Sequence, residues 1–157
     1  MKKSFLFVVL LAICNYQTLF AQDGTKEPYS QLLTAYYGIK DALVNDHASA
    51  AASSATSFIQ AVNAANNETV KDEIRSSLLK DANKISQSKD LTVQREMFAT
   101  LSTTMIALAK SVKLSPEPVY LQYCPMKKSS WLSNTKAIKN PYYGNAMLTC
   151  GNIKETL

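Results

Sequence analysis

Apolar residues recur every three or four positions through the middle of the chain, which is the spacing of one face of an α-helix. Residues 29–112 contain no proline and a single glycine, so few residues there would break a helix. The spacing predicts four helices: the first ends near Asn45, the second begins at Asp46 as its N-cap, the third follows residues 66–69, and the fourth runs from Asp90 to Ser115. The predicted core positions are Tyr29, Leu32, Tyr36, Ile39 and Leu43; Ala48, Ala51, Ala55, Phe58 or Ile59, and Val62; Val70, Ile74, Leu78, Ala82 and Ile85; Phe98, Leu101, Met105, Leu108 and Val112.

The links between these helices are short and polar, so consecutive helices should pack antiparallel to one another. The fold predicted for residues 29–112 is therefore an up-down-up-down four-helix bundle, and the fold class is all-α.

The chain changes character after residue 112. Four prolines, the single tryptophan and four tyrosines fall within residues 116–143, a composition that excludes one continuous helix. Asn140–Pro141 and the segment 143–145 have the composition of turns. We expect an irregular, aromatic-rich C-terminal hook over residues 113–157, folded over one end of the bundle and held there by its aromatic side chains.

The N-terminus has the pattern of a secretory signal peptide over residues 1–21, because Lys2 and Lys3 precede a short apolar run. The run is too short to span a membrane, so the mature chain, 22–157, is expected to be a single exported, periplasmic domain with no transmembrane segment. A lipoprotein anchored at Cys14 is the second interpretation, which is disfavoured because Ile13 stands where a lipobox needs a small residue.

The charge balance is mildly basic and uneven. Without the signal peptide the chain has 15 basic and 12 acidic residues, which is no nucleic-acid-binding signature. From Lys113 onward there are six lysines against two glutamates, so the positive excess surrounds the two cysteines of the mature chain. A solvated face is the favoured interpretation of these lysines, and a docking surface is the alternative.

Those two cysteines each lie close to a methionine, as Cys124-Pro125-Met126 and as Met147-Leu148-Thr149-Cys150. Thiolate and thioether sulfurs are soft donors that select Cu(I) or Ag(I) over magnesium, calcium or manganese. If the hook brings the two pairs together, Cys124, Met126, Met147 and Cys150 form a site of up to four sulfur ligands. The Cys-x2-Cys spacing typical of structural zinc is absent.

A disulfide is the competing interpretation, since two cysteines in an exported protein are a standard setting for one bridge. It would close a loop of about 26 residues and contribute roughly 3 kcal/mol. Lys127 and Lys128 beside Cys124 favour its thiolate, which both interpretations require. No enzyme is expected, because a cysteine dyad with His47, the only histidine, lacks any supporting motif.

The tail motifs YCPM, WLS, I-K-N-P-Y-Y-G and M-L-T-C-G, together with QREMFATLS upstream, resemble an uncharacterised bacterial exported domain family. Its members occur alone or attached to periplasmic adaptor subunits of copper/silver efflux systems. The Y-x-C-P-M element is also similar to short heavy-metal-binding modules, although the histidine that usually follows is Lys127 here. This resemblance implies a role in copper or silver handling and raises metal binding above the disulfide.

The resulting hypothesis is a periplasmic protein that binds Cu(I) or Ag(I) at the four sulfurs and sequesters the ion or hands it to an efflux adaptor component. The alternative is a protein-interaction domain without metal, in which a Cys124–Cys150 disulfide pins the hook.

Overall fold

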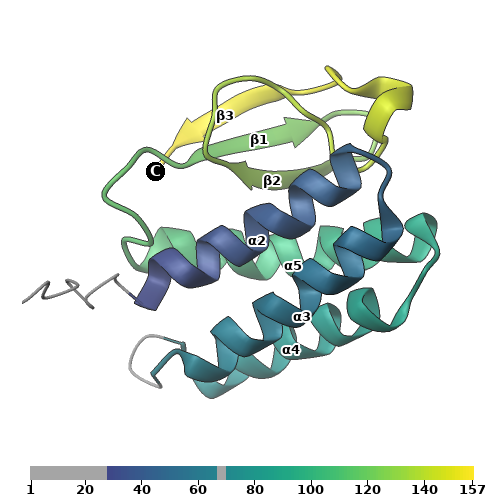
Figure 1. Ribbon diagram of the computed structural model, residues 1–157. Coiled ribbons are helices and arrows are strands. Elements are labelled where there is room, and N and C mark those ends of the chain that lie inside the picture. The colour runs from purple at the N-terminus through teal and green to yellow at the C-terminus, as the bar shows by residue number, and fades with distance from the viewer. Residues whose placement is uncertain (1–27, 67–69) are drawn as a thin grey trace, which may run out of the picture.

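The computed structural model describes residues 28–66 and 70–157, which include all four predicted helices. Each helix packs against the next, and the chain reverses direction at every link (Figure 1). The predicted signal peptide and Cys14 lie outside the described residues. The helices are α2 (Pro28–Val44), α3 (Ala48–Ala64), α4 (Asp72–Gln87) and α5 (Leu91–Ser111).

The predicted apolar faces form the core of this bundle. Sixteen of the predicted positions are fully buried or nearly so, and Tyr29, Ile59, Ile74 and Val112 pack partly buried at its margins, whereas Ala48 is only partly covered. The buried face of α3 is narrow and largely alanine, so its neighbours approach it closely. The buried residues are Leu32, Tyr36, Ile39, Leu43, Ala51, Ala55, Phe58, Val62, Val70, Leu78, Ala82, Ile85, Phe98, Leu101, Met105 and Leu108.

The two predicted N-caps have different outcomes. Asp90 caps α5 as predicted, since its carboxylate accepts a hydrogen bond of 2.7 Å from the Thr92 N–H. The prediction for Asp46 was wrong, because His47 occupies the cap position of α3. Asp46 has a φ of 59°, and its carboxylate turns away to Arg95 and Asn145.

The C-terminal segment corrects the all-α prediction. It contains a three-stranded antiparallel sheet built from β1 (Tyr120–Cys124), β2 (Ser129–Ser133) and β3 (Asn152–Thr156), in the order β2-β1-β3. Between β2 and β3 the chain forms a short 3-10 helix, η1 (Gly144–Met147). Neither β1 nor β2 alternates between buried and exposed residues, because both of their faces are covered, and β3 is exposed throughout. The period-two signal by which strands are recognised is therefore missing.

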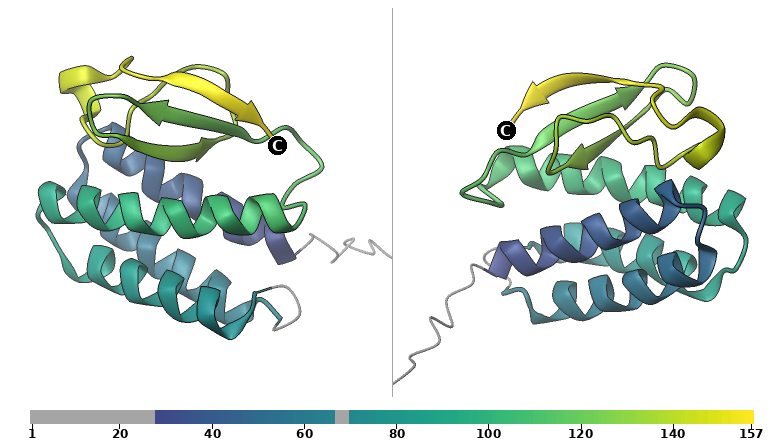
Figure 2. Two further views of the ribbon diagram at one scale, coloured as in Figure 1. Left: turned by 180° about the vertical axis from the view of Figure 1, so that it is seen from behind. Right: turned by 45° about the horizontal axis from the view of Figure 1, so that its top comes forward.

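The sheet lies along the flank of the bundle and not over its end, as Figures 1 and 2 show. The molecule has three layers: the sheet, then α2 and α5, then α3 and α4. Strand β2 packs directly on α5. None of the described helices combines the length and the apolarity that a membrane span requires.

A continuous row of aromatic rings joins the sheet to the bundle, as the composition of the tail predicted. Tyr36 of α2 stacks on Phe98 of α5 with ring centroids 5.1 Å apart, and Tyr142 lies 6.1 Å from Phe98 and 5.8 Å from Trp131. Offset and edge-to-face contacts of this kind stabilise beyond the area that they bury.

Hydrogen bonds from two tyrosines fix β2 in place. The buried Tyr36 hydroxyl accepts a 3.1 Å hydrogen bond from the Leu132 N–H and shares one of 2.7 Å with the Ser102 hydroxyl. The Tyr142 hydroxyl donates to the Ser130 carbonyl at 2.6 Å. Strand β2 is therefore positioned both by ring packing and by its own backbone groups.

Candidate functional site: a cysteine pair between strand and loop

The two cysteines meet because their strands are neighbours. Cys124 is the last residue of β1, and Cys150 stands two residues before β3, whose Asn152 pairs with Tyr123. The two Sγ atoms lie 3.6 Å apart, and both cysteines are free thiols. Of the four sulfur residues predicted for the site, the structure brings these two into contact.

Cys124 is fully buried at the start of a tight hairpin turn. Residues 125–128 connect β1 to β2, and Lys128 has a φ of 54°, a left-handed conformation that closes the turn. This turn aims the Lys127 backbone N–H at the Cys124 sulfur, with an N–Sγ distance of 3.4 Å. The Lys127 ammonium points elsewhere and pairs with Glu96 of α5.

The surroundings of the two thiols separate their acidities. Burial acts to raise the pKa of Cys124, but hydrogen bonds from the Lys127 N–H, the Asn140 amide, the Cys150 thiol and the Met126 N–H outweigh it, so its pKa is lowered. The pKa of Cys150 is raised by desolvation and by the neighbouring Cys124 sulfur. The pair therefore favours a thiolate at Cys124 beside a protonated Cys150. The lowered pKa of Cys124 comes from these backbone and side-chain donors in place of the lysine ammonium groups that the sequence suggested.

Asn140 organises the loop that carries Cys150. It is fully buried, and its amide donates to the Cys150 carbonyl at 2.7 Å while its Oδ1 accepts from the Tyr142 N–H at 2.8 Å. Its backbone N–H donates to the Leu148 carbonyl at 2.8 Å, and its carbonyl accepts from the Gly144 N–H at 3.0 Å. One side chain thus ties together both ends of the segment 140–150 and hydrogen-bonds the Cys124 sulfur.

Gly151 lets this loop lie flat against the sheet. Its φ is 155°, and a Cβ placed there would lie 3.0 Å from the Trp131 ring, 3.0 Å from the Tyr123 carbonyl and 3.1 Å from Ile138. A side chain at this position would push the residue that follows Cys150 away from the sheet. Glycine is therefore required after Cys150 in the tail motif for steric reasons.

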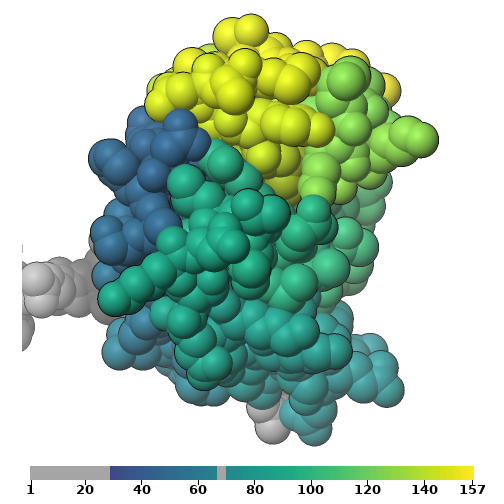
Figure 3. All heavy atoms as spheres, turned by 90° about the vertical axis from the view of Figure 1, so that its right-hand side faces the viewer, coloured from purple at the N-terminus to yellow at the C-terminus, as the bar shows by residue number. Residues whose placement is uncertain are grey.

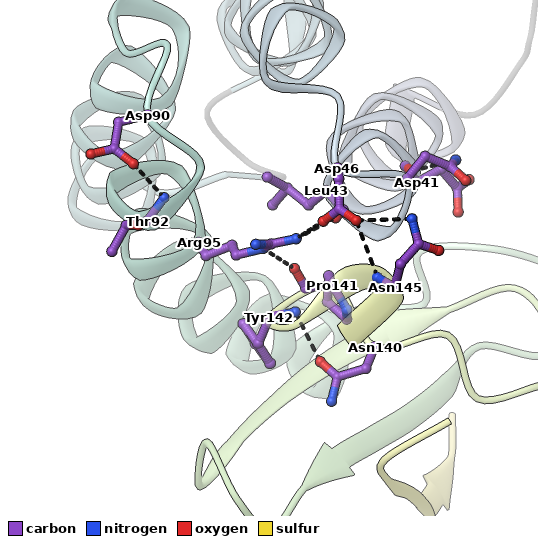
Figure 4. Close-up of polar contacts among 11 residues, drawn as sticks. Asp41, Leu43, Asp46, Asp90, Thr92, Arg95, Asn140, Pro141, Tyr142 and Asn145 are labelled. Atoms are coloured by element: carbon purple, nitrogen blue, oxygen red, sulfur yellow. Dashed lines mark hydrogen bonds and ion pairs between the residues drawn. The ribbon is translucent and has the colours of Figure 1, made fainter. Parts of the chain in front are cut away.

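A charged network holds the same loop to the bundle (Figure 4). Arg95 of α5 pairs with Asp46 and donates to the Leu43 and Pro141 carbonyls, at 3.1 Å in each case. Asp46 in turn accepts from the backbone and side-chain amides of Asn145 at 3.2 and 2.9 Å. Figure 3 shows the C-terminal segment seated on the α2–α3 turn and the start of α5, where this network lies.

The glycine of η1 is part of that contact. Gly144 has a φ of 53°, and a Cβ there would lie 2.6 Å from Arg95 Nη2 and 2.8 Å from the Asp46 carboxyl carbon. The Arg95 hydrogen bond lowers the pKa of Asp46, with the Asn145 amides adding to it against a smaller effect of burial. Because a Cβ at position 144 would overlap both partners of the Arg95–Asp46 ion pair, the ion pair and the loop fit together only with glycine at this position.

The remaining predicted residues are Met126 and Met147, which are close to the cysteines along the chain, and His47. Met126 stands at the tip of the hairpin with 64 % of its surface exposed. Met147 is partly buried at the end of η1, and its carbonyl accepts from the Cys150 N–H at 3.1 Å. His47 is exposed at the start of α3. Among the described residues, no group of three or more histidine, cysteine or acidic side chains forms a metal-binding cluster.

The spacing of the sulfurs limits the chemistry of the pair. A metal–sulfur bond of about 2.3 Å places two ligands of one tetrahedral ion roughly 3.8 Å apart, whereas bonded sulfurs lie about 2.05 Å apart. The observed 3.6 Å is within a few tenths of an ångström of the first value and about 1.5 Å longer than the second. The separation alone is therefore compatible with a shared ion and with a disulfide.

Several residues that shape the site were not predicted as functional. Asn140 was recognised only as part of a turn, and Arg95 only as part of the QREMFATLS motif. Gly144 and Gly151 both have a positive φ, which glycine adopts readily. The sequence does not show which side chains they approach. The roles of Arg95 and Asp46 depend on contacts across 46 to 99 residues of chain, as between Arg95 and Pro141 and between Asp46 and Asn145.

Compared with known proteins, the chain matches the model of a family described as protein of unknown function (DUF3347), over residues 32–117. The matched segment is more than half of the chain and covers the helical bundle. It ends before β1, so the cysteine pair lies beyond it. No curated protein and no solved structure matches the chain.

Proposed function

Because the chain belongs to the DUF3347 family of proteins of unknown function, we propose its function from the cysteine pair: it binds Cu(I) or Ag(I) through Cys124 and Cys150. The observation that carries this proposal is the 3.6 Å separation of two free thiols with one sulfur already surrounded by hydrogen-bond donors. A preformed pair of sulfurs lowers the ordering cost of binding an ion between them.

The donor set favours a soft ion. In the described part of the chain, no histidine or carboxylate joins the two thiols as a third ligand. Structural zinc requires four ligands. Cu(I) and Ag(I) prefer sulfur and bind with few ligands. Met126 and Met147 are the proposed thioether ligands, and both lie between the two cysteines along the chain.

The exposure of the sulfur residues suits an ion that is carried and passed on. Cys124 is buried and Cys150 partly buried, whereas Met126 projects from the hairpin into solvent. An incoming ion would meet the Met126 thioether or Cys150 before Cys124, and it would leave by the reverse order. Stepwise replacement of sulfur ligands keeps the ion coordinated throughout such a transfer.

The proposed setting is the periplasm, and the proposed recipient is an adaptor component of a copper or silver efflux system. Both rest on the signal-peptide pattern and on the resemblance of the tail motifs. The protein would hold the ion away from other ligands until the recipient offers its own sulfurs.

The proposal is tested by competition for Cu(I) between the reduced, anaerobic protein and a chromophoric chelator. The wild type should take one ion per chain, and the Cys124→Ser/Cys150→Ser variant should take none. Met126→Leu and Met147→Leu should each weaken the affinity by about tenfold, equivalent to roughly 1.4 kcal/mol. Met97→Leu is the matched control, since Met97 lies on α5 and is not one of the proposed ligands, so its substitution should leave the affinity unchanged.

Failure of the reduced wild type to compete would refute the metal function. Full binding by the double serine variant would show that the ion sits elsewhere. If Met126→Leu and Met147→Leu leave the Cu(I) affinity unchanged while the double serine variant loses it, the ligands are the two cysteines alone.

The second candidate is the interaction domain pinned by a Cys124–Cys150 disulfide. The same proximity favours it, because closing the sulfurs requires only about 1.5 Å of movement. A bridge that forms quantitatively during expression and resists mild reductant would select this candidate.

A further inference from the structure

The two thiols of the pair differ sharply in their access to solvent. Cys124 has none of its surface exposed, since it lies under the loop that carries Cys150. Cys150 is partly exposed, between the exposed Thr149 and the partly exposed Gly151. A reagent in solution can therefore reach Cys150 while the protein is folded, but not Cys124.

We infer that the pair carries out thiol–disulfide exchange with small-molecule disulfides, with Cys150 as the sulfur that reacts first and Cys124 as the sulfur that resolves the mixed disulfide. The inference rests on the unequal exposure and on the 3.6 Å between the sulfurs. It does not depend on metal binding, although it uses the same two residues.

The first step is attack by Cys150 on a disulfide such as oxidised glutathione. Cys150 loses its proton to solvent, its Sγ forms a bond to one glutathione sulfur, and the other glutathione leaves as a thiolate. The protein then carries a mixed disulfide at Cys150, and Cys124 remains reduced beneath it.

The second step is attack by the Cys124 thiolate on Cys150 Sγ. The Cys124–Cys150 bond forms and the second glutathione leaves as a thiolate, so two protein thiols are oxidised while one disulfide is reduced to two thiols. The Lys127 N–H lies 3.4 Å from the Cys124 sulfur and donates a hydrogen bond to it. The attacking sulfur already lies in contact with its target.

Acidity and access make opposite predictions for the first step. The lower pKa belongs to Cys124, so a reaction governed by thiolate population alone would begin there. A reaction governed by access begins at Cys150. Identifying the sulfur that reacts first therefore separates the two explanations.

The test treats reduced, chelator-washed full-length protein and its single serine variants with oxidised glutathione, and follows intact mass and peptide maps. Cys124→Ser should accumulate one glutathione on Cys150, because no sulfur remains to resolve it. Folded Cys150→Ser should react with oxidised glutathione at about one-tenth of the rate of Cys124→Ser, or more slowly still. The wild type should lose both thiols and retain no glutathione.

A second measurement covers the possibility that a serine variant does not fold. Reduced wild type is alkylated with less than one equivalent of iodoacetamide, and the label should map to Cys150. Circular dichroism of each variant establishes that it is folded before its rate is compared.

Two results would overturn the inference. One is labelling or glutathionylation of Cys124 at a rate equal to or above that of Cys150. The other is a wild type that keeps glutathione on Cys150 without forming the internal disulfide, which would show that Cys124 does not resolve it.

Discussion

The hydroxyl of Tyr36 links α2 to β2 and α5 at the junction between bundle and sheet. Its removal is therefore the most informative single substitution for measuring how this junction stabilises the protein. Tyr36→Phe keeps the ring and its stacking on Phe98 but deletes the partner of the Leu132 N–H and of the Ser102 hydroxyl. Because Leu132 is fully buried, water cannot replace the lost acceptor without a structural change.

The expected loss follows from these two partners. A buried N–H without an acceptor costs about 1–3 kcal/mol. Ser102 lies within α5, where its hydroxyl can turn to the carbonyl four residues earlier, so its contribution is small. Tyr36→Phe should therefore lower the free energy of unfolding by about 2 kcal/mol.

The neighbouring residue provides a matched control. The Tyr37 hydroxyl is buried and has no hydrogen-bond partner among the described residues. Tyr37→Phe removes a buried polar atom that makes no compensating bond, so it should be neutral or stabilise by up to about 1 kcal/mol. The two substitutions delete the same atom from adjacent positions, and only Tyr36→Phe should destabilise the protein.

Urea unfolding of the reduced, metal-free variants measures both effects. Circular dichroism reports the helices, and the fluorescence of Trp131, the only tryptophan, reports the sheet. Equal stability of Tyr36→Phe and wild type would refute the reasoning, as would a loss in Tyr37→Phe as large as that in Tyr36→Phe.

Three further predictions concern the loop and the pair. Gly151→Ala should destabilise by about 2–3 kcal/mol, measured by urea unfolding, because its Cβ meets the Tyr123 carbonyl and Trp131; a change below about 0.5 kcal/mol would contradict the close approach. The folded-state pKa of Asp46 is lowered, so its stabilisation is present above its unfolded pKa and disappears as pH falls through the folded value. The difference in unfolding free energy between wild type and Asp46→Asn should thus shrink from pH 5 downward, and a constant difference would refute the linkage. Cu(I) affinity should rise between about pH 6 and 8, because the ion displaces the proton that the raised pKa of Cys150 retains; a pH-independent affinity would exclude Cys150 as a thiolate ligand.

The helices were predictable because their signal is local. Residues such as Phe98, Leu101 and Met105 follow the three-four spacing of one buried face, and Asp90 caps its own helix two residues away. Asp46 was mistaken for a cap because the preference for aspartate at that position is a local rule. The carboxylate of Asp46 instead pairs with Arg95, which is distant in the sequence.

The sheet and most of the site were not predictable by the same reasoning. β1 and β3 pair across a long connection, and the covered faces of β1 and β2 remove the alternation that would mark them. The cysteines were recognised from their chemistry alone. Their contact depends on strand pairing and on Asn140, which binds the Cys150 carbonyl.

The two tyrosine hydroxyls on β2 have a consequence for how this sheet meets other chains. β2 is an edge strand, and its Leu132 N–H and Ser130 carbonyl are occupied by Tyr36 and Tyr142, where the backbone of a fourth strand would otherwise bind. The opposite edge, β3, is exposed and carries Lys154 and Glu155, charges of the kind that discourage unplanned strand pairing. Extension of the sheet by another polypeptide is thus blocked on the side of the bundle, and on the other side it requires a strand whose charges complement those of β3.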